Sequence, residues 1–220
     1  MAAWLAAGAG TTTLAAEESG WISLFNGRDL SGWEQRGGRA EYVVEGGELV
    51  GRSVPRTPNS FLCTTRVFTN FVLELEFKVA TNLNSGIQIR SECHDEAREV
   101  QVGDRTIRIP AGRVHGYQIE IDPGARAWSG GIYDEGRRGW LKDLKENDAA
   151  RAAFRSGEWN RFRIEARGPW IRTWINGVSA AELEDEMTPA GFIGLQVHGV
   201  GNREDPLEIR WRHLRLRELP

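Results

Sequence analysis

Hydrophobic and polar residues alternate along several short segments of this chain. From Phe71 to Val79 every odd-numbered residue is apolar, while Glu74, Glu76 and Lys78 occupy positions between them. Residues 162–166 and 171–175 show the same period of two. This period places one face of a strand in a core and the other toward water. We therefore expect half-buried β-strands in these three segments.

Two dipeptides mark irregular points in this pattern. Asn176-Gly177 follows the third segment and predicts a tight hairpin turn. Near the end of the chain, Ile209 and Trp211 share one phase, but Leu214 and Leu216 continue in the opposite phase. The phase changes at Arg212-His213, where we expect a β-bulge.

The pattern predicts little helix. One helix is expected from Ala149 to Phe154, with Asn147 or Asp148 as its N-cap and Gly157 after its end. Apolar residues on both sides of Gly103-Asp104 predict a protruding hairpin over residues 99–110. Short strands with one short helix favour an all-β fold, an antiparallel two-sheet sandwich of the jelly-roll type.

Composition narrows the classes of function. The 220 residues include 28 Lys and Arg against 31 Asp and Glu, a net charge of −3, which gives no support to a nucleic-acid partner. Two cysteines exclude a disulfide-rich scaffold and a four-thiolate zinc site. No apolar segment is long enough to predict membrane insertion. A single domain over residues 20–220 is the simplest division.

Residues 1–19 form a separate leader in this prediction. Residues 2–16 are small and mostly apolar, and Leu14-Ala15-Ala16 resembles the end of a secretion signal, although no basic residue precedes Arg28. A truncated signal predicts a periplasmic or secreted protein whose mature form lacks residues 1 to about 18. A leader without function is the alternative. After export, Cys63 and Cys93 could pair or remain two buried thiols.

Three further strands carry an unusual mixture of polar residues on one face. The expected outward-facing residues are Gln88 and Arg90, then Gln118, Glu120 and Asp122, then Gln196 and His198. If these strands are neighbours, their polar faces form the floor of a cleft. Otherwise they are three unrelated solvent-exposed strand faces. Gly86 and Gly194 would let a ligand approach the backbone of this floor.

Several of these side chains suit catalysis. Glu120 and Asp122 lie two apart on a strand, about 7 Å from each other, a spacing that suits a shared metal, a glycosidic bond between them or plain surface charge. His198 is a candidate general base or metal ligand, or it makes a structural hydrogen bond. A divalent ion held by Glu120, Asp122 and His198 is one option. No motif indicates a nucleotide cofactor.

The polar and aromatic segment 130–140 is expected to form a rim loop over this floor. In it, Tyr133 is a candidate hydrogen-bonding group, Arg137 or Arg138 a candidate to polarise an oxygen, and Trp140 a candidate to stack on a sugar ring. Trp174 is a further candidate for stacking. Either tryptophan could instead be a packing residue. His94 and His115, which flank the expected hairpin, have weaker cases as site residues.

Five motifs in this order resemble those of the 3-keto-disaccharide hydrolase family, also called DUF1080. They are residues 25–33 (FNGRDLSGW), 45–51 (EGGELVG), 69–77 (TNFVLELEF), 84–90 (NSGIQIR) and 191–198 (GFIGLQVH). The resemblance implies a concanavalin A-like jelly roll with a sugar cleft on one sheet. It also implies action on glycosides oxidised at C3, mostly in exported bacterial proteins. Segments 99–110 and 134–140 depart from the commonest family pattern.

Cleavage of a C3-oxidised glycoside needs a base, a group that stabilises the C3 oxyanion and an acid for the leaving oxygen, and the polar strand faces and the rim loop supply candidates for each. A ketone at C3 acidifies the C2 proton, which His198 or Glu120 would remove. Arg90 or a metal would stabilise the enolate, and Tyr133 would protonate the departing oxygen. Hydrolysis by two carboxylates is a competing mechanism. A non-catalytic carbohydrate-binding jelly-roll module is the alternative function.

Overall fold

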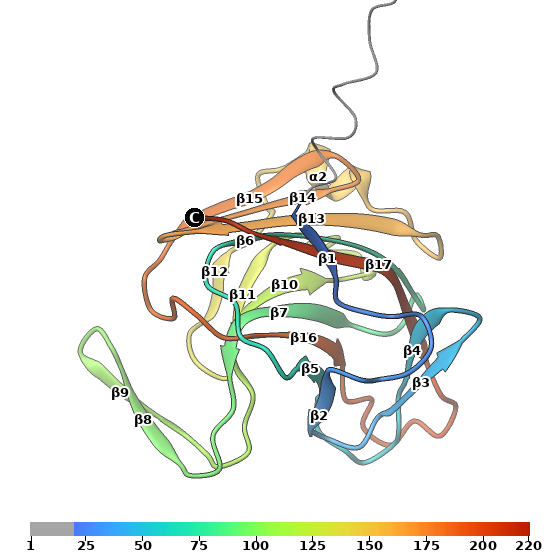
Figure 1. The fold of residues 1–220 in the computed structure, drawn as a ribbon, viewed down its shortest axis with the longest axis horizontal. Helices are drawn as coiled ribbons and strands as arrows, with labels where there is room; N and C mark the ends of the chain where they lie inside the picture. Colours follow the sequence, from blue (N-terminus) through green and yellow to red (C-terminus); the bar gives the residue numbers. More distant parts are fainter. Residues whose placement is uncertain (1–19) are drawn as a thin grey trace, which may run out of the picture.

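The computed structural model describes residues 20–220, in which two antiparallel sheets pack face to face (Figure 1). The predicted leader lies outside the described residues. In the first sheet the strand order is β15 (Val178–Glu184), β14 (Trp170–Ile175), β13 (Asn160–Arg167), β6 (Phe71–Val79), β17 (Glu208–Glu218), β4 (Glu48–Arg52) and β3 (Glu41–Glu45). Strand β1 (Trp21–Ser23) pairs with β17 outside this order.

The second sheet carries the polar faces singled out above. Its strand order is β12 (Gly139–Lys142), β11 (Ile132–Glu135), β10 (His115–Ile121), β7 (Ser85–Glu92), β16 (Phe192–Val197), β5 (Ser60–Thr64) and β2 (Trp33–Gly37). Sequence-distant strands are neighbours in both sheets. This arrangement confirms the predicted antiparallel two-sheet sandwich of the jelly-roll type.

The core lies between the two sheets and contains the residues that the alternation predicts. All five apolar odd-numbered residues of β6 are at most 3% exposed, and Phe162, Ile164 and Ile175 are fully buried. In β17 the register shifts between Arg212 and Arg215, and His213 has a φ of +53°. The bulge therefore turns Leu214 and Leu216 into the same core as Ile209 and Trp211, as the change of phase predicts.

The helix and the turns also follow the sequence. Helix α2 (Asp148–Ala153) begins after Asn147, whose side chain accepts a hydrogen bond from the Ala150 N–H. Asn176 and Gly177 join β14 to β15 with φ values of +49° and +85°, which suits a type I′ turn. The expected hairpin is formed by β8 (Arg98–Val102) and β9 (Arg105–Ile109), which project as an arm from the sandwich (Figure 1).

Two further sequence expectations concern cysteines and membranes. Cys63 is buried and Cys93 half-buried, and both are free thiols. Within residues 20–220, no helix has the length and apolar character needed to cross a membrane.

Candidate active site

The three polar strand faces meet on the second sheet. Strands β10, β7 and β16 are consecutive in its order, so the predicted neighbourhood is confirmed. Gln118 lies at the centre of the resulting network. Its Oε1 accepts hydrogen bonds from Gln88 Nε2 at 2.6 Å and from Gln196 Nε2 at 2.9 Å. Two donors on one oxygen fix the orientation of the Gln118 amide.

The fixed amide of Gln118 donates to Glu120. Its Nε2 lies 2.8 Å from Glu120 Oε2, and Asn84 Nδ2 lies 2.6 Å from the other carboxylate oxygen. Glu120 is only 4% exposed, and this burial raises the pKa of its carboxyl group, although the two amide donors oppose the shift. The strand pattern thus places a single oriented carboxylate, more basic than an ordinary Glu, on the floor.

A pocket of about 650 Å³ opens above this floor. Its lining includes Glu120, Gln118 and Gln196, together with His198 directly after β16. The Oε1 atom of Gln196 is buried and has no hydrogen-bond partner among the described residues. An unpartnered acceptor in such a pocket suits a ligand hydroxyl group. The volume lies within the range of small-molecule sites.

Aromatic residues form one wall of the pocket. Tyr133 of β11 pairs with Gln118 on one side and with Trp140 of β12 on the other, so these side chains share the pocket face. The Trp140 ring meets Tyr133 edge-on at 5.4 Å and Trp128 at 4.8 Å between centroids. The predicted rim loop is therefore a short hairpin that presents a tyrosine hydroxyl and an indole ring to the pocket.

Arg126 is a cation of the pocket lining. The Arg126 guanidinium lies 2.9 Å from Asp122, 3.9 Å from Glu120 and over both the Trp128 and Trp140 rings. It is the cation that faces Glu120 from the loop after β10. Its side chain is half exposed, so it stays within reach of a ligand.

Glu135 lies on the same face at the end of β11. It is 5% exposed and forms a 2.6 Å ion pair with Arg113, while burial raises the pKa of its carboxyl group against the opposing charges of Arg113 and His198. The His198 Nδ1–H donates to Gly199 O at 2.8 Å. In the neutral ring this leaves Nε2 as an acceptor, so His198 also has the form of a general base.

The prediction that Arg90 faces the cleft is wrong. The register of β7 shifts after Ile89 in its pairing with β10 and after Gln88 in its pairing with β16. Arg90 lies within this irregular stretch and has a φ of +44°. This bulge turns Arg90 off the polar face and leaves Ser91 there, where its Oγ donates to Gln88 Oε1 at 2.8 Å. The Arg90 guanidinium donates instead to Thr69 O and Gly168 O, both at 2.7 Å, where it links loops of the other sheet.

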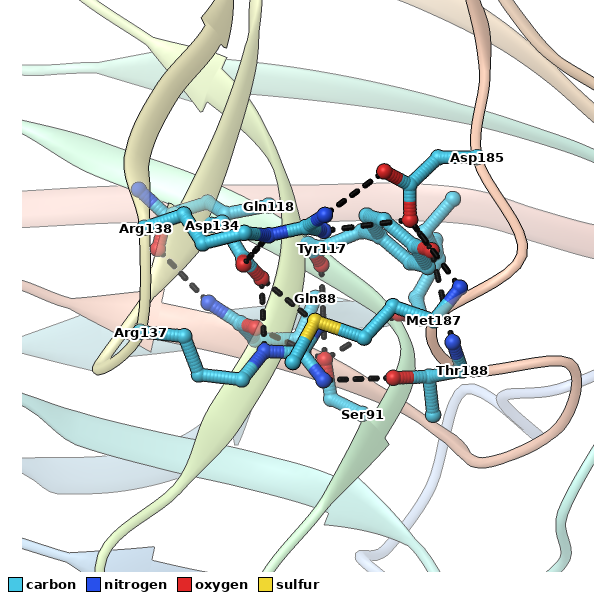
Figure 2. A network of polar contacts seen from close by, with 11 residues as sticks. Gln88, Ser91, Tyr117, Gln118, Asp134, Arg137, Arg138, Asp185, Met187 and Thr188 are labelled. Atoms are coloured by element: carbon cyan, nitrogen blue, oxygen red, sulfur yellow. Dashed lines mark hydrogen bonds and ion pairs between the residues drawn. The ribbon is translucent and has the colours of Figure 1, made fainter. Parts of the chain in front are cut away.

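Arg138 also lies outside the pocket lining, in a buried charge network. Figure 2 shows Arg137 and Arg138 converging from the β11–β12 turn on Asp134, with Asp185 on the facing segment. Asp134 is fully buried and lies 2.6 Å from Arg137 and 2.5 Å from Arg138. Arg138 also pairs with Asp185 at 2.6 Å, and Asp185 accepts a hydrogen bond from Tyr117. This network positions the turn that carries Tyr133 and Trp140.

The expected stacking role of Trp174 is wrong as well. Trp174 lies on β14 of the first sheet, and its neighbours Thr173 and Ile175 point into the core. Its ring therefore lies on the outer face of the other sheet, under the Arg163 guanidinium at 5.7 Å.

The proposed metal site of Glu120, Asp122 and His198 does not form. Among residues 20–220, these three do not bring ligand atoms within 4.8 Å of one another. Asp122 is instead held by Arg126 and by the Gly124 N–H at 3.0 Å, and Glu120 by its two amide donors. The ligand space expected at Gly86 is also occupied, because a Cβ there would lie 2.5 Å from the Gln118 side chain.

Sequence reasoning assigned no role to Asn84, Arg113, Arg126 or Glu135. Asn84 stands in the Asn-Ser-Gly motif just before β7, and Glu135 in the segment singled out as a rim loop, so both had a visible signal. Arg113 and Arg126 lie in loops beside β10, where alternation carries no information on side-chain direction.

Solved structures with the same fold include carbohydrate-related proteins. A Parabacteroides distasonis protein assigned as a glycosyl hydrolase is 17% identical with a TM-score of 0.61, over 96% of this chain and 99% of that one. The carbohydrate-binding module CBM66 of Bacillus subtilis is 12% identical with a TM-score of 0.57, over 85% and 96%.

A Bacillus subtilis protein with a galectin-like fold is 12% identical with a TM-score of 0.65, over 90% of this chain and 94% of that one. At these identities the likeness concerns the fold alone. None of the curated proteins compared with this chain matches it.

The family comparison covers nearly all of the described chain. The model of the 3-keto-alpha-glucoside-1,2-lyase-like domain matches residues 20–217, which include both sheets and every residue of the pocket. This match confirms the resemblance carried by the five motifs. The chain belongs to the family of 3-keto-alpha-glucoside-1,2-lyase-like domains.

Proposed function

We propose that this protein cleaves 3-keto glycosides by elimination across the C1–C2 bond. The observation that carries the proposal is Glu120, a buried carboxylate with a raised pKa, oriented by two amides and facing a polar pocket. A carboxylate whose pKa is raised is a stronger base than an ordinary Glu, which suits it to removing a carbon-bound proton that a neighbouring ketone has acidified. The family description names this class of reaction.

In the first step Glu120 takes the C2 proton. The electron pair of the C2–H bond forms a C2=C3 double bond, and the C3 oxygen becomes an enolate anion. Arg126 is the cation assigned to this oxygen because its guanidinium lies 3.9 Å from the Glu120 carboxylate and is steadied by Asp122. A charge held in place before the reaction stabilises the anion without reorganisation.

In the second step the enolate expels the C1 substituent. The C3 carbonyl re-forms, a C1=C2 double bond appears, and the C1–O bond breaks with its electron pair on the leaving oxygen. Tyr133 supplies the proton for that oxygen. Burial and the nearby Glu135 and Glu120 charges raise the pKa of its hydroxyl group, so it carries its proton at neutral pH. The products are an alcohol and an unsaturated 3-keto sugar.

The C3 ketone is the feature that separates this reaction from ordinary glycoside hydrolysis. Without the ketone, the C2 proton is too weakly acidic for a carboxylate to remove. The test is incubation of the purified protein with a 3-keto glucoside and, separately, with its parent glucoside. We expect release of the alcohol from the first and almost none from the second. Equal rates would favour hydrolysis by two carboxylates, and binding without turnover would favour a carbohydrate-binding module.

Trp140 is assigned to substrate binding. We expect Trp140→Ala to weaken affinity for the 3-keto glucoside by about tenfold, because an aromatic contact contributes about 0.5–1.5 kcal/mol and about 1.4 kcal/mol corresponds to a factor of ten. Calorimetric titration with a slowly cleaved substrate analogue measures the affinity, and thermal unfolding measures stability. Trp174→Ala, on the outer face of the other sheet, is the matched control and should leave affinity unchanged. A large fall in melting temperature with unchanged affinity would show Trp140 to be a packing residue.

A further inference from the structure

A group of metal-binding side chains lies outside the pocket lining. Glu92, His94 and His115 each place one ligand atom within 4.8 Å of the others. His94 Nε2 lies 3.5 Å from Glu92 Oε2, and the two imidazole centroids are 5.6 Å apart. Zinc bonds of about 2.0–2.2 Å in a tetrahedral site place ligand atoms about 3.4 Å from each other. The Glu92–His94 pair already has this separation.

His115 provides the independent evidence for a ligand. It is 2% exposed, and neither of its ring nitrogens has a hydrogen-bond partner among the described residues. A buried imidazole with two unsatisfied nitrogens is costly unless another group binds it. Burial, together with the nearby Arg137 charge, lowers the pKa of His115 to about 4, so the ring is neutral and has a lone pair at neutral pH.

Carboxylates near His115 oppose the positive charge of Arg137. Arg137 and Arg138 both pair with Asp134, and Arg138 pairs with Asp185, so this network holds two positive and two negative charges. Glu92 adds one negative charge beside the two imidazoles. At His115 the negative charges of Glu92 and Asp134 act against the positive charge of Arg137.

The position of the group in the fold indicates what an ion would do. Glu92 ends β7 and pairs with His115 at the start of β10, while His94 lies just beyond β7. The whole β8–β9 arm is inserted between His94 and His115, and its base is already closed by the Gly112 N–H donating to His94 O at 2.8 Å. An ion bound by all three side chains would join the two ends of this insertion.

We propose that Glu92, His94 and His115 bind a divalent transition-metal ion that fixes the base of the β8–β9 arm. Two imidazoles and one carboxylate suit zinc and its first-row neighbours better than calcium or magnesium. Three protein ligands leave one tetrahedral position for water. This inference is independent of the proposed cleavage reaction, since none of the three side chains lines the pocket.

Titration of chelator-stripped protein with Zn²⁺, against a chromophoric competitor, tests the proposal. We expect one ion per chain and a loss of affinity of more than about a hundredfold in His94→Gln and in His115→Gln. His94 and Glu92 are partly exposed, so His94→Gln and Glu92→Gln keep the test valid if His115→Gln fails to fold. Co²⁺ should give visible absorption bands typical of tetrahedral coordination, absent from the variants.

His213→Asn is the matched control. His213 also lies beside a carboxylate, 3.3 Å from Glu76, but in the β17 bulge, where Asn tolerates the positive φ. This variant, and Asp122→Asn from the other predicted ligand set, should bind Zn²⁺ as the unmodified protein does. Amide exchange over residues 95–114 should slow when Zn²⁺ is added. Equal affinity in the unmodified protein and His94→Gln, or no slowing of exchange, would overturn the proposal.

Discussion

Replacing Glu120 with Gln is expected to lower kcat on a 3-keto glucoside by about a hundredfold or more, the usual range for loss of a general base. The amide cannot accept the C2 proton. It also faces two donors, Asn84 Nδ2 and Gln118 Nε2. The NH2 group of the new amide would therefore lie against one of these N–H donors without an acceptor between them. Steady-state kinetics measures the effect, and circular dichroism establishes that the variant folds.

Glu135→Gln is the matched control, because it removes another buried carboxylate from the same pocket. It should leave most of kcat in place. The pH profile gives a second readout, since kcat/KM must fall as Glu120 becomes protonated. Its raised pKa places this acid limb above the ordinary Glu value of about 4.3. A full loss in His198→Gln with little loss in Glu120→Gln would assign the base to His198.

Asp134→Asn is expected to lower the free energy of unfolding by about 3–5 kcal/mol, the range for removing one partner of a buried ion pair. Asp134 is fully buried, and its two oxygens face Arg137 and Arg138 (Figure 2). Without its charge, Arg137 has no other carboxylate partner within residues 20–220, although its Nη1 still donates to Thr188 Oγ1. Chemical denaturation measures the change.

Asp148→Asn provides the comparison at the surface. Asp148 pairs with Arg151 at 3.1 Å, but its side chain is 93% exposed, and such pairs contribute less than about 1 kcal/mol. We expect a correspondingly small change. If Asp134→Asn were as mild as Asp148→Asn, the buried network would not be what holds the β11–β12 turn. Substrate affinity should also weaken in Asp134→Asn, because that turn positions Tyr133 and Trp140.

The strand pattern predicted the fold and the floor of the site because alternation reports side-chain direction within a regular strand. Gln88, Gln118 and Gln196 share one face for this reason, and the change of phase in β17 revealed its bulge. Arg90 shows where the rule fails. Its bulge leaves the apolar pattern of β7 unchanged, since Ile89 is the last apolar residue of the strand. The turn of Arg90 away from the floor could not be seen in the sequence.

The walls of the site were harder to predict than its floor. Arg126 and Arg113 come from loops, whose side-chain directions follow from tertiary contacts such as the Trp128 and Trp140 rings. His115 was noted only for flanking the hairpin, because its burial and unpartnered nitrogens arise from the packing of β10 against the β11–β12 turn. Pairing across the sheet, which sequence does not specify, brings Glu92 to it.

The proposed elimination removes the proton on C2, so a substrate deuterated at that carbon tests it directly. We expect the 3-keto glucoside with deuterium at C2 to be cleaved more slowly than the unlabelled compound, and mass spectrometry of the sugar product to find the deuterium lost. A parallel incubation without protein corrects for spontaneous exchange beside the ketone. A product that retains deuterium at C2, formed at an unchanged rate, would contradict elimination and show that the C1–O bond breaks by direct hydrolysis.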